Sequence, residues 1–203
     1  MNVLVVAAHP DDEVLGCGGT ILRHVEDGDN VKVLIMAEGR DGDGLRQAAI
    51  NANRFMGSTV EFLRLPDQKM DTVPFLDIVQ SIEQYTDGID IVYTHFGGDL
   101  NLDHRLTYQA TMTACRPLPG STIKQILCFE VLSSTEWGKG FEPNCFISID
   151  ILDKWRILEC YAEEMRDFPH PRSFGSVLDL ANLRGATVGI PAVEAFMVER
   201  IIC

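Results

Sequence analysis

A histidine and three carboxylates follow directly on the first apolar run of the sequence. Residues 9–13 (HPDDE) come straight after a continuous apolar stretch at residues 3–8, which is typical of a strand buried on both faces of a parallel sheet. Carboxylates crowded at the end of such a strand need a cation or a shared proton to offset their repulsion. Imidazole and carboxylate together are a common zinc ligand set, so the segment indicates a metal site.

Asp12 alone also has a plainer interpretation, because acidic residues are favoured at the N-cap and in the first turn of any helix. A second polar cluster changes the balance. Residues 94–105 (THFGGDLNLDHR) close the fourth predicted strand just as residues 9–13 follow the first. If these two strands are neighbours, the second cluster supplies the ligand that the first one lacks.

Strands and helices alternate through the first half of the chain. Apolar runs at residues 3–8, 31–37, 59–63 and 89–95 predict strands, and residues 12–27, 45–56 and 73–85 predict helices. This alternation predicts an α/β fold: a Rossmann-like, doubly wound, mostly parallel sheet with helices on both faces. In the common strand order 3-2-1-4-5, the first and fourth strands lie side by side where the order reverses, so the two clusters meet.

The second half is less regular, and we expect one domain over residues 1–203. Helices are predicted at residues 107–115, 153–165 and 173–185, and strands at 123–131, 145–149 and, as an edge strand, 195–202. Residues 38–44 (EGRDGDG) predict a charged, glycine-rich loop. His24 lies among polar residues of a predicted helix, so we expect it to be exposed to solvent.

The meeting of the two clusters predicts a metal site with three protein ligands. His9, Asp12 and His104 leave one coordination position open, as a catalytic zinc requires. The remaining carboxylate, Asp11, is then placed to act on a bound water as a general base. Asp11 and Asp12 therefore have different tasks in this interpretation.

The composition excludes several classes of protein. Seventeen Lys and Arg against thirty Asp and Glu give a formal charge of −13, which disfavours nucleic acid as a partner. No apolar run is long enough for a membrane helix and no signal-peptide pattern is present, so we expect a cytoplasmic protein without membrane insertion. The six cysteines form no CxxC pair, and we expect reduced, mostly buried thiols. The sequence also contains neither a GxGxxG nor a GxSxG motif, which argues against dinucleotide binding and a serine hydrolase.

The two clusters resemble the motifs of a known enzyme family. AHPDDE at residues 8–13 looks like the opening motif of the PIG-L/LmbE family of zinc-dependent sugar de-N-acetylases, and GDLNLDHR at residues 98–105 is similar to its second metal motif. Residues 184–185 (RG) and 194–196 (EAF) resemble its C-terminal pattern. The resemblance implies hydrolysis of the acetamide of an N-acetylglucosamine-type sugar. It also implies one Zn²⁺ per chain, or another divalent transition metal, on the three ligands named above.

By the same resemblance, Asp11 is the base. Arg46 falls where related enzymes have an arginine that contacts the sugar or its substituent. Many members have a histidine three residues before the last metal ligand, whereas this chain has Asn101. An asparagine can donate a hydrogen bond to an oxyanion but cannot protonate the leaving amine. Asp103 is expected to orient a neighbouring group.

The proton donor to the amine is therefore open between His95, His170 and Asp11, and we favour Asp11 as base and then acid. His170 and Arg172 lie in the proline-rich segment 167–173 (DFPHPRS). This segment suits substrate recognition and, equally, a plain surface turn ahead of a helix. We include His95, His170 and Arg172 with Arg46 among the candidate substrate contacts.

The expected reaction is metal-assisted hydrolysis of a small acetylated amino sugar. Two alternatives stay open: a zinc hydrolase of another small N-acyl or amide substrate, and a non-catalytic sugar-binding module of the same fold. An open metal position beside a free carboxylate disfavours the binding module. Arg46 and Arg172 favour a nucleotide-activated sugar over a thiol-linked glycoside, because a diphosphate needs cationic partners. The sequence leaves assembly into a homo-oligomer open.

Overall fold

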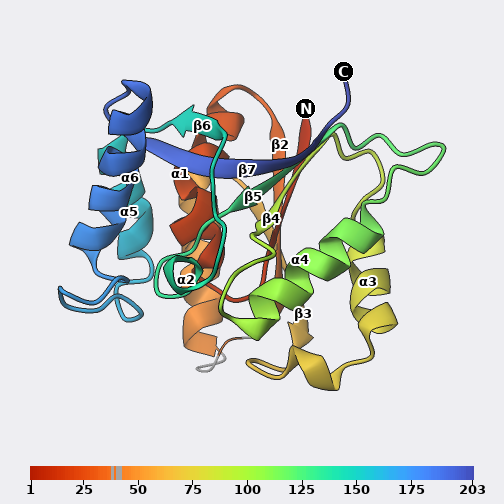
Figure 1. Ribbon diagram of the computed structural model, residues 1–203. Coiled ribbons are helices and arrows are strands. Elements are labelled where there is room, and N and C mark those ends of the chain that lie inside the picture. Colours follow the sequence, from red (N-terminus) through yellow and green to blue (C-terminus); the bar gives the residue numbers. More distant parts are fainter. Residues whose placement is uncertain (38, 40–42) are drawn as a thin grey trace.

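The computed structural model describes residues 1–37, 39 and 43–203 and contains one seven-stranded sheet with helices on both faces (Figure 1). The loop expected at residues 38–44 therefore lies largely outside the described residues. The strand order is β3-β2-β1-β4-β5-β7-β6. The strands are β1 (Asn2–Ala7), β2 (Asn30–Ala37), β3 (Thr59–Leu65), β4 (Ile91–His95), β5 (Gln125–Phe129), β6 (Cys145–Ser148) and β7 (Val193–Ile201).

The first five strands confirm the predicted fold class and the order 3-2-1-4-5. All of them pair in parallel, and β1 lies between β2 and β4. The carboxyl ends of parallel neighbours lie at the same end of the sheet, so the segments that follow β1 and β4 come together there. The N-terminus lies at the opposite end of these strands (Figure 1).

The last strand is not the edge strand that we expected at residues 195–202. β7 runs antiparallel between β5 and β6, and β6 forms the edge of the sheet. Its first half, Val193 to Phe196, pairs with β6, whereas Phe196 to Ile201 pair with β5. The prediction was wrong because the apolar pattern of a strand does not show which strands it will pair with.

Alternate residues of the strands face two separate cores. Val3 and Val5 of β1 belong to one core and Leu4 and Val6 to the other, because successive side chains of a strand point to opposite faces. None of the described helices is long and apolar enough to cross a membrane. The first core packs against α1 (Asp12–Glu26), α2 (Asp43–Met56), α5 (Ile151–Glu159) and α6 (Phe174–Val188). The second packs against the 3₁₀ turn η1 (Met70–Thr72), α3 (Phe75–Glu83) and α4 (Leu102–Ala114) (Figure 1).

Two helices differ from their predicted bounds in ways that affect the site. α4 begins at Leu102, five residues before the predicted start, because the Asn101 side chain caps it by accepting a 2.8 Å hydrogen bond from the Asp103 N–H. His104 therefore projects from the first turn of a helix instead of from a loop. α5 ends at Glu159, and Tyr161 in the following turn points inward to a buried carboxylate of α1.

Isolated polar and sulfur-containing side chains were less predictable. His24 is half-buried instead of exposed, because its Nδ1 lies 2.7 Å from Asp29 and its Nε2 lies 2.9 Å from the Tyr93 hydroxyl. These partners come from the turn after α1 and from β4, so the local pattern of α1 could not show them. All six cysteines lie within the described residues and are free thiols, of which three are buried.

α1 is broken in its middle, where a buried lysine binds the backbone. Cys17 leaves the helical conformation, with φ −147° and ψ 23°. The Lys154 ammonium of α5 donates hydrogen bonds to the carbonyl oxygens of Val14 and Leu15, at 2.5 and 2.9 Å. Carbonyl groups at the end of a helical segment have no helical partner, so Lys154 satisfies the end of the first half of α1.

The carboxylate of Glu194, from β7, binds the N–H groups at the start of the second half of α1. This carboxylate accepts hydrogen bonds from the N–H groups of Gly19 and Thr20, at 2.9 and 2.7 Å, and lies 2.5 Å from Lys154 Nζ. A negative charge at a helix N-terminus and a positive charge at a C-terminus are both favourable. The Lys154–Glu194 pair therefore joins the two halves of α1, the first of which carries Asp12.

Replacing one member of this buried pair should destabilise the protein strongly. The two side chains are 2% and 5% exposed, so Lys154→Met leaves Glu194 as an uncompensated buried charge. We expect the free energy of unfolding to fall by about 3–5 kcal/mol in urea titrations. The matched control is Arg156→Met on the same helix, whose partner is Asp153 and whose side chain is 61% exposed; we expect a loss of about 0–1 kcal/mol. Equal small losses in both variants would contradict the structural role of the pair.

Candidate functional site

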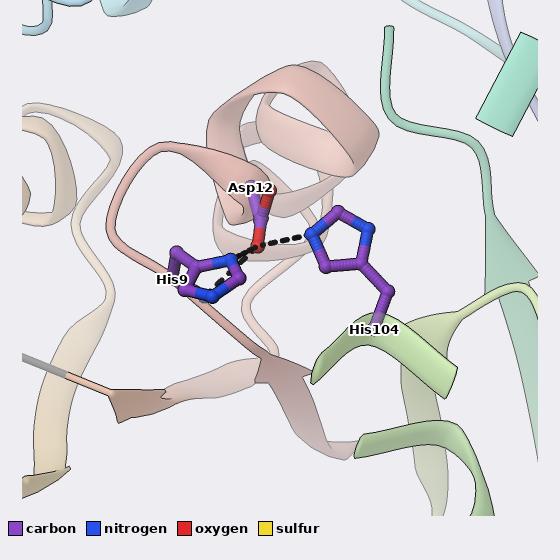
Figure 2. A group of neighbouring side chains, drawn as sticks. All are labelled: His9, Asp12 and His104. Carbon is purple, nitrogen blue, oxygen red and sulfur yellow. Dashed lines mark hydrogen bonds and ion pairs between the residues drawn. The ribbon is translucent and has the colours of Figure 1, made fainter. Parts of the chain in front are cut away.

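The two polar clusters meet at the carboxyl ends of β1 and β4. His9 and Asp12 come from the turn after β1 and the start of α1, and His104 comes from the first turn of α4. Asp12 Oδ2 lies 3.2 Å from His9 Nδ1 and 3.3 Å from His104 Nε2, as the dashed lines in Figure 2 mark. One ligand atom from each of the three side chains lies within 4.8 Å of the others, so the group can hold a metal ion.

Each of these two imidazoles is bound by a carboxylate on its other nitrogen. His9 Nε2 lies 3.1 Å from Asp103 Oδ2, and His104 Nδ1 lies 3.2 Å from Asp99 Oδ1. Carboxylates that bind the outer nitrogen of a metal-ligating histidine fix its tautomer and ring orientation. The inner nitrogens of His9 and His104 therefore both face Asp12. Asp99 is itself held by the hydroxyl groups of Ser134 and Thr135.

The electrostatics of this cluster favour bound positive charge. Burial by itself lowers the pKa of His9, but the hydrogen bonds to Asp103 and Asp12 outweigh it and raise the pKa to about 10. Burial also opposes the charged form of His104, yet Asp12 and Asp99 raise its pKa to about 9. A divalent cation can replace the two protons, because it supplies the same charge to the same donors. Two imidazoles and one carboxylate are a donor set that fits zinc and similar divalent metals.

A second group of possible ligands lies on the other side of His9. It consists of Nε2 of His9 with Asp67 and Asp103, and the shortest contact to Asp67 is 3.5 Å. A metal ion bound there would break the contact that orients the His9 ring. Asp67 is also only half-buried, in contrast to the fully buried Asp12. The Asp12 group is therefore the better candidate, and Asp67 offers a control for it.

A polar cavity of about 370 Å³ opens over the candidate ligands. A cavity of this size with convergent polar groups is typical of small-molecule sites. Of the predicted site residues, the structure brings His9, Asp11, Asp12, Asn101, His104, His170 and Arg172 to its walls.

Asp11 lies beside the metal-ligand group and pairs with an arginine. Its Oδ2 accepts a 2.8 Å hydrogen bond from Arg172, which comes from the segment before α6. Burial raises the pKa of Asp11 to about 8, even though the charge of Arg172 opposes this shift. A carboxyl with a pKa close to neutrality can both take up and release a proton during a reaction. Arg172, expected as a substrate contact, is therefore also a partner of the candidate base.

Two predicted substrate contacts lie away from the cavity. His95 is completely buried, with its ring stacked on His104 at a centroid distance of 4.0 Å, and its Nε2 accepts a hydrogen bond from the Ala8 N–H. Burial lowers the pKa of His95 to about 4, so the ring is neutral. Arg46 stacks on the ring of Phe62 at 4.3 Å and does not line the cavity described above. His95 is thus a buried packing partner of the His104 ring, which the sequence alone could not show.

Asn101 and Asp103 have structural contacts as well as places near the site. Asn101 lines the cavity, and because its Oδ1 caps α4, its amide nitrogen is the atom that can donate to a bound molecule. Asp103 binds His9 and also accepts a 3.2 Å hydrogen bond from the Met70 N–H of η1. The contact with His9 is the kind of orienting interaction expected for Asp103 from the sequence.

The sequence did not indicate the contacts of three buried residues at the site. Asp99 belongs to the GDLNLDHR cluster and could have been paired with His104 from that motif. Glu13 was counted among the carboxylates of the first cluster, but its hydrogen bonds to the Asp11 N–H and to the Tyr161 hydroxyl were not foreseen. Tyr161 carries no local signal, because its partner lies 148 positions away along the chain.

Comparisons with known proteins identify the family and the relatives that this chain resembles. Residues 4–115 match the family model PIG-L, described as GlcNAc-PI de-N-acetylase. The chain is 32% identical over 161 residues to the uncharacterized deacetylase YaiS of Escherichia coli K12, which covers 73% of this chain and 82% of that protein.

Solved structures show the same fold at lower sequence identity. The conserved protein TT1542 from Thermus thermophilus superimposes with a TM-score of 0.81 at 21% identity, over 99% of this chain and 96% of its own. The N,N′-diacetylchitobiose deacetylase from Pyrococcus horikoshii gives a TM-score of 0.79 at 18% identity, over 98% of this chain and 84% of its own.

The metal-free protein should lose stability as the pH rises above neutrality. In the folded state the pKa values of His9 and His104 are about 10 and 9, above their ordinary value of 6.5. Their contribution to stability is therefore complete below about pH 6.5 and is lost as the pH rises through 9 and 10. The raised pKa of Asp11 also makes the folded protein less stable as the pH rises, up to about pH 8. We expect the free energy of unfolding, measured in urea with a chelator present, to fall between pH 7 and pH 9.

A matched measurement on the same protein isolates the site. The free energy of unfolding should depend less on pH in His104→Gln, because this variant lacks one of the two protonated rings. It should also depend less on pH when a divalent metal replaces the chelator, because the ion displaces the protons. A metal-free wild-type protein whose stability is constant or rises over this pH range would contradict the assignment.

Proposed function

Because this chain belongs to the PIG-L family of de-N-acetylases, we propose that it is a zinc-dependent enzyme that removes the N-acetyl group from an N-acetylglucosamine-type sugar. The products are acetate and a free amino sugar. The observation that carries the proposal is the group His9, Asp12 and His104, with Asp11 beside it on the wall of an open polar cavity.

The proposed metal site uses His9, Asp12 and His104 as ligands for one zinc ion. When bound there, zinc supplies a Lewis acid that lowers the pKa of a water molecule and polarises the acetyl carbonyl. Asp103 and Asp99 hold the two imidazoles with their inner nitrogens toward Asp12. This arrangement keeps the ligands in place before the substrate enters, so little reorganisation is needed.

Asp11 acts first as general base and then as general acid. Its carboxylate takes the proton from the attacking water, and the carboxylic acid so formed donates that proton to the leaving amine. Arg172 holds Asp11 Oδ2 at 2.8 Å and leaves the other oxygen for this transfer. His170 is the second candidate for the proton donor, because it also lines the cavity, whereas the buried His95 does not.

Asn101 is the proposed donor to the oxyanion that develops on the acetyl carbonyl. Its amide nitrogen carries hydrogens that the helix cap does not use, and a fixed donor of this kind stabilises a developing negative charge. The helix cap keeps the Asn101 side chain in one orientation, which a donor needs if it is to act without reorganisation. Asp103 acts indirectly in this scheme, through its contact with His9.

Among the described residues, the contacts of Arg172 and Arg46 favour a neutral glycoside as substrate. Arg172 is paired with Asp11 and lies 3.9 Å from Glu164, and Arg46 stacks on Phe62. The charge of Arg172 is therefore paired and Arg46 lies outside the cavity, so among the described residues these two arginines do not favour a nucleotide-activated sugar. The Pyrococcus horikoshii protein named above is a deacetylase of a chitobiose, which agrees with a sugar substrate for this fold.

Metal content tests the proposed ligands directly. We expect about one zinc per chain in the purified protein by elemental mass spectrometry, and loss of that zinc in Asp12→Ala. Asp67→Ala is the matched control, because it removes a carboxylate only from the second possible ligand group. Zinc retained in Asp12→Ala but lost in Asp67→Ala would show that the metal binds the second group of ligands, on the other side of His9.

Turnover tests the base. In Asp11→Asn we expect the zinc content to be unchanged and kcat for acetate release from N-acetylated sugars to fall by about 10²- to 10⁴-fold, because the amide cannot accept the proton. The substrate panel should include N-acetylglucosamine glycosides, a nucleotide-activated N-acetylglucosamine and simple N-acetyl amines. Near-normal kcat in Asp11→Asn would remove Asp11 from the mechanism. Acetate release from the simple amines alone would replace the sugar with another N-acyl substrate.

A further inference from the structure

Asp11 has a backbone conformation that a non-glycine residue rarely adopts. Its φ is 101° and its ψ is −28°, in the left-handed region, at the position just before α1. A non-glycine residue in such a backbone conformation is strained, and the conformation persists only where the surroundings enforce it. The conformation also sets the direction of the carboxylate that faces the cavity. Some part of the structure must therefore hold the backbone of Asp11.

The carboxylate of Glu13 provides this hold. Glu13 Oε2 accepts a 3.0 Å hydrogen bond from the Asp11 N–H, and the Asp11 carbonyl accepts from the N–H groups of Val14 and Leu15 at 3.1 and 2.8 Å. The backbone of Asp11 is thus bound on both sides. This return bond from a first-turn glutamate to the residue before the helix resembles one half of a capping box.

Glu13 itself is fixed from another part of the chain. Its side chain is 0% exposed and is absent from the walls of the cavity described above, so it cannot touch a substrate bound there. Its Oε1 accepts a 2.6 Å hydrogen bond from the Tyr161 hydroxyl, and Asn53 Nδ2 of α2 lies at 3.5 Å. Tyr161 is fully buried in the turn after α5. A buried carboxylate needs such partners, because burial removes it from bulk water.

We propose that Glu13 and Tyr161 are positioning residues for Asp11: the Tyr161 hydroxyl orients the Glu13 carboxylate, which holds the Asp11 backbone in its left-handed conformation. The inference rests on the proposed function in one respect, the assignment of Asp11 as the base. It adds that the turn after α5, far away in sequence, sets the geometry of the proton transfer. Catalytic groups displaced by small distances lose much of their effect, so the loss should fall on kcat.

The test compares two tyrosines that each lose one hydroxyl. In Tyr161→Phe we expect kcat for acetate release to fall about tenfold, with KM and zinc content unchanged. Tyr93→Phe is the matched control, because Tyr93 is also buried and its hydroxyl binds His24 outside the cavity. We expect this control to keep kcat within about twofold of the wild type, with a change in Tm similar to that of Tyr161→Phe.

Conservative replacement gives a second, independent comparison. Glu13→Gln keeps an oxygen that can accept from the Asp11 N–H, whereas Glu13→Ala removes it. We expect kcat of Glu13→Gln to exceed that of Glu13→Ala by about tenfold at equal zinc content. If Glu13→Ala does not fold, Tyr161→Phe still decides the proposal. Equal kcat in Glu13→Gln and a folded Glu13→Ala would overturn it.

Crystal structures of the wild type and of Tyr161→Phe separate this inference from the proposed function. We expect the φ angle of Asp11 to leave the left-handed region, or its carboxylate to turn, in Tyr161→Phe but not in Tyr93→Phe. A Tyr161→Phe protein with unchanged Asp11 geometry and a kcat within about twofold of the wild type would overturn the proposal. A wild-type protein that releases no acetate from any N-acetylated sugar would overturn the proposed function instead. The geometry of Asp11 in the variant would then decide the positioning inference without kinetics.

Discussion

Buried negative charge at the carboxyl ends of β1 and β4 is the constraint on which the rest of this structure depends. Asp12, Asp99 and Asp103 surround the rings of His9 and His104, and all five residues are buried. Carboxylates in such a place repel one another strongly unless positive charge lies among them. This need accounts for the raised pKa values of both histidines and for the fit of a divalent metal ion to the same donors.

The scaffold makes this arrangement rigid by taking each ligand from the end of a regular element. The parallel pairing of β1 with β4 brings the two clusters together, and the cap at Asn101 starts α4 early enough to aim His104 at Asp12. The Lys154–Glu194 pair joins the two halves of α1 at Cys17, so that the short first half, which carries Asp12, is tied to α5 and β7. Sites built on such elements hold their geometry better than sites on loops.

The match to the PIG-L family and the walls of the cavity involve different parts of the chain. The family model covers residues 4–115, which include both clusters, whereas the cavity also takes His170 and Arg172 from the second half of the chain. The solved structures named above are at most 21% identical to this chain and show the fold alone. Arg172 and Tyr161 lie outside the matched region. Differences between family members in the proposed substrate and in the positioning of Asp11 are therefore to be sought in this second part of the chain.

The sequence by itself determined the α/β fold, the order of the first five strands and the meeting of the two polar clusters that follow β1 and β4. Apolar runs and polar clusters are local signals, and parallel strands bring their ends together whatever the details of packing. Only the tertiary structure decided the insertion of β7 beside β5, the burial of His95 behind His104, the pairing of Arg172 with Asp11 and the hold of Tyr161 on Glu13. These contacts join residues far apart in the chain, and which of them form depends on how the helices pack over the sheet, which no local pattern encodes.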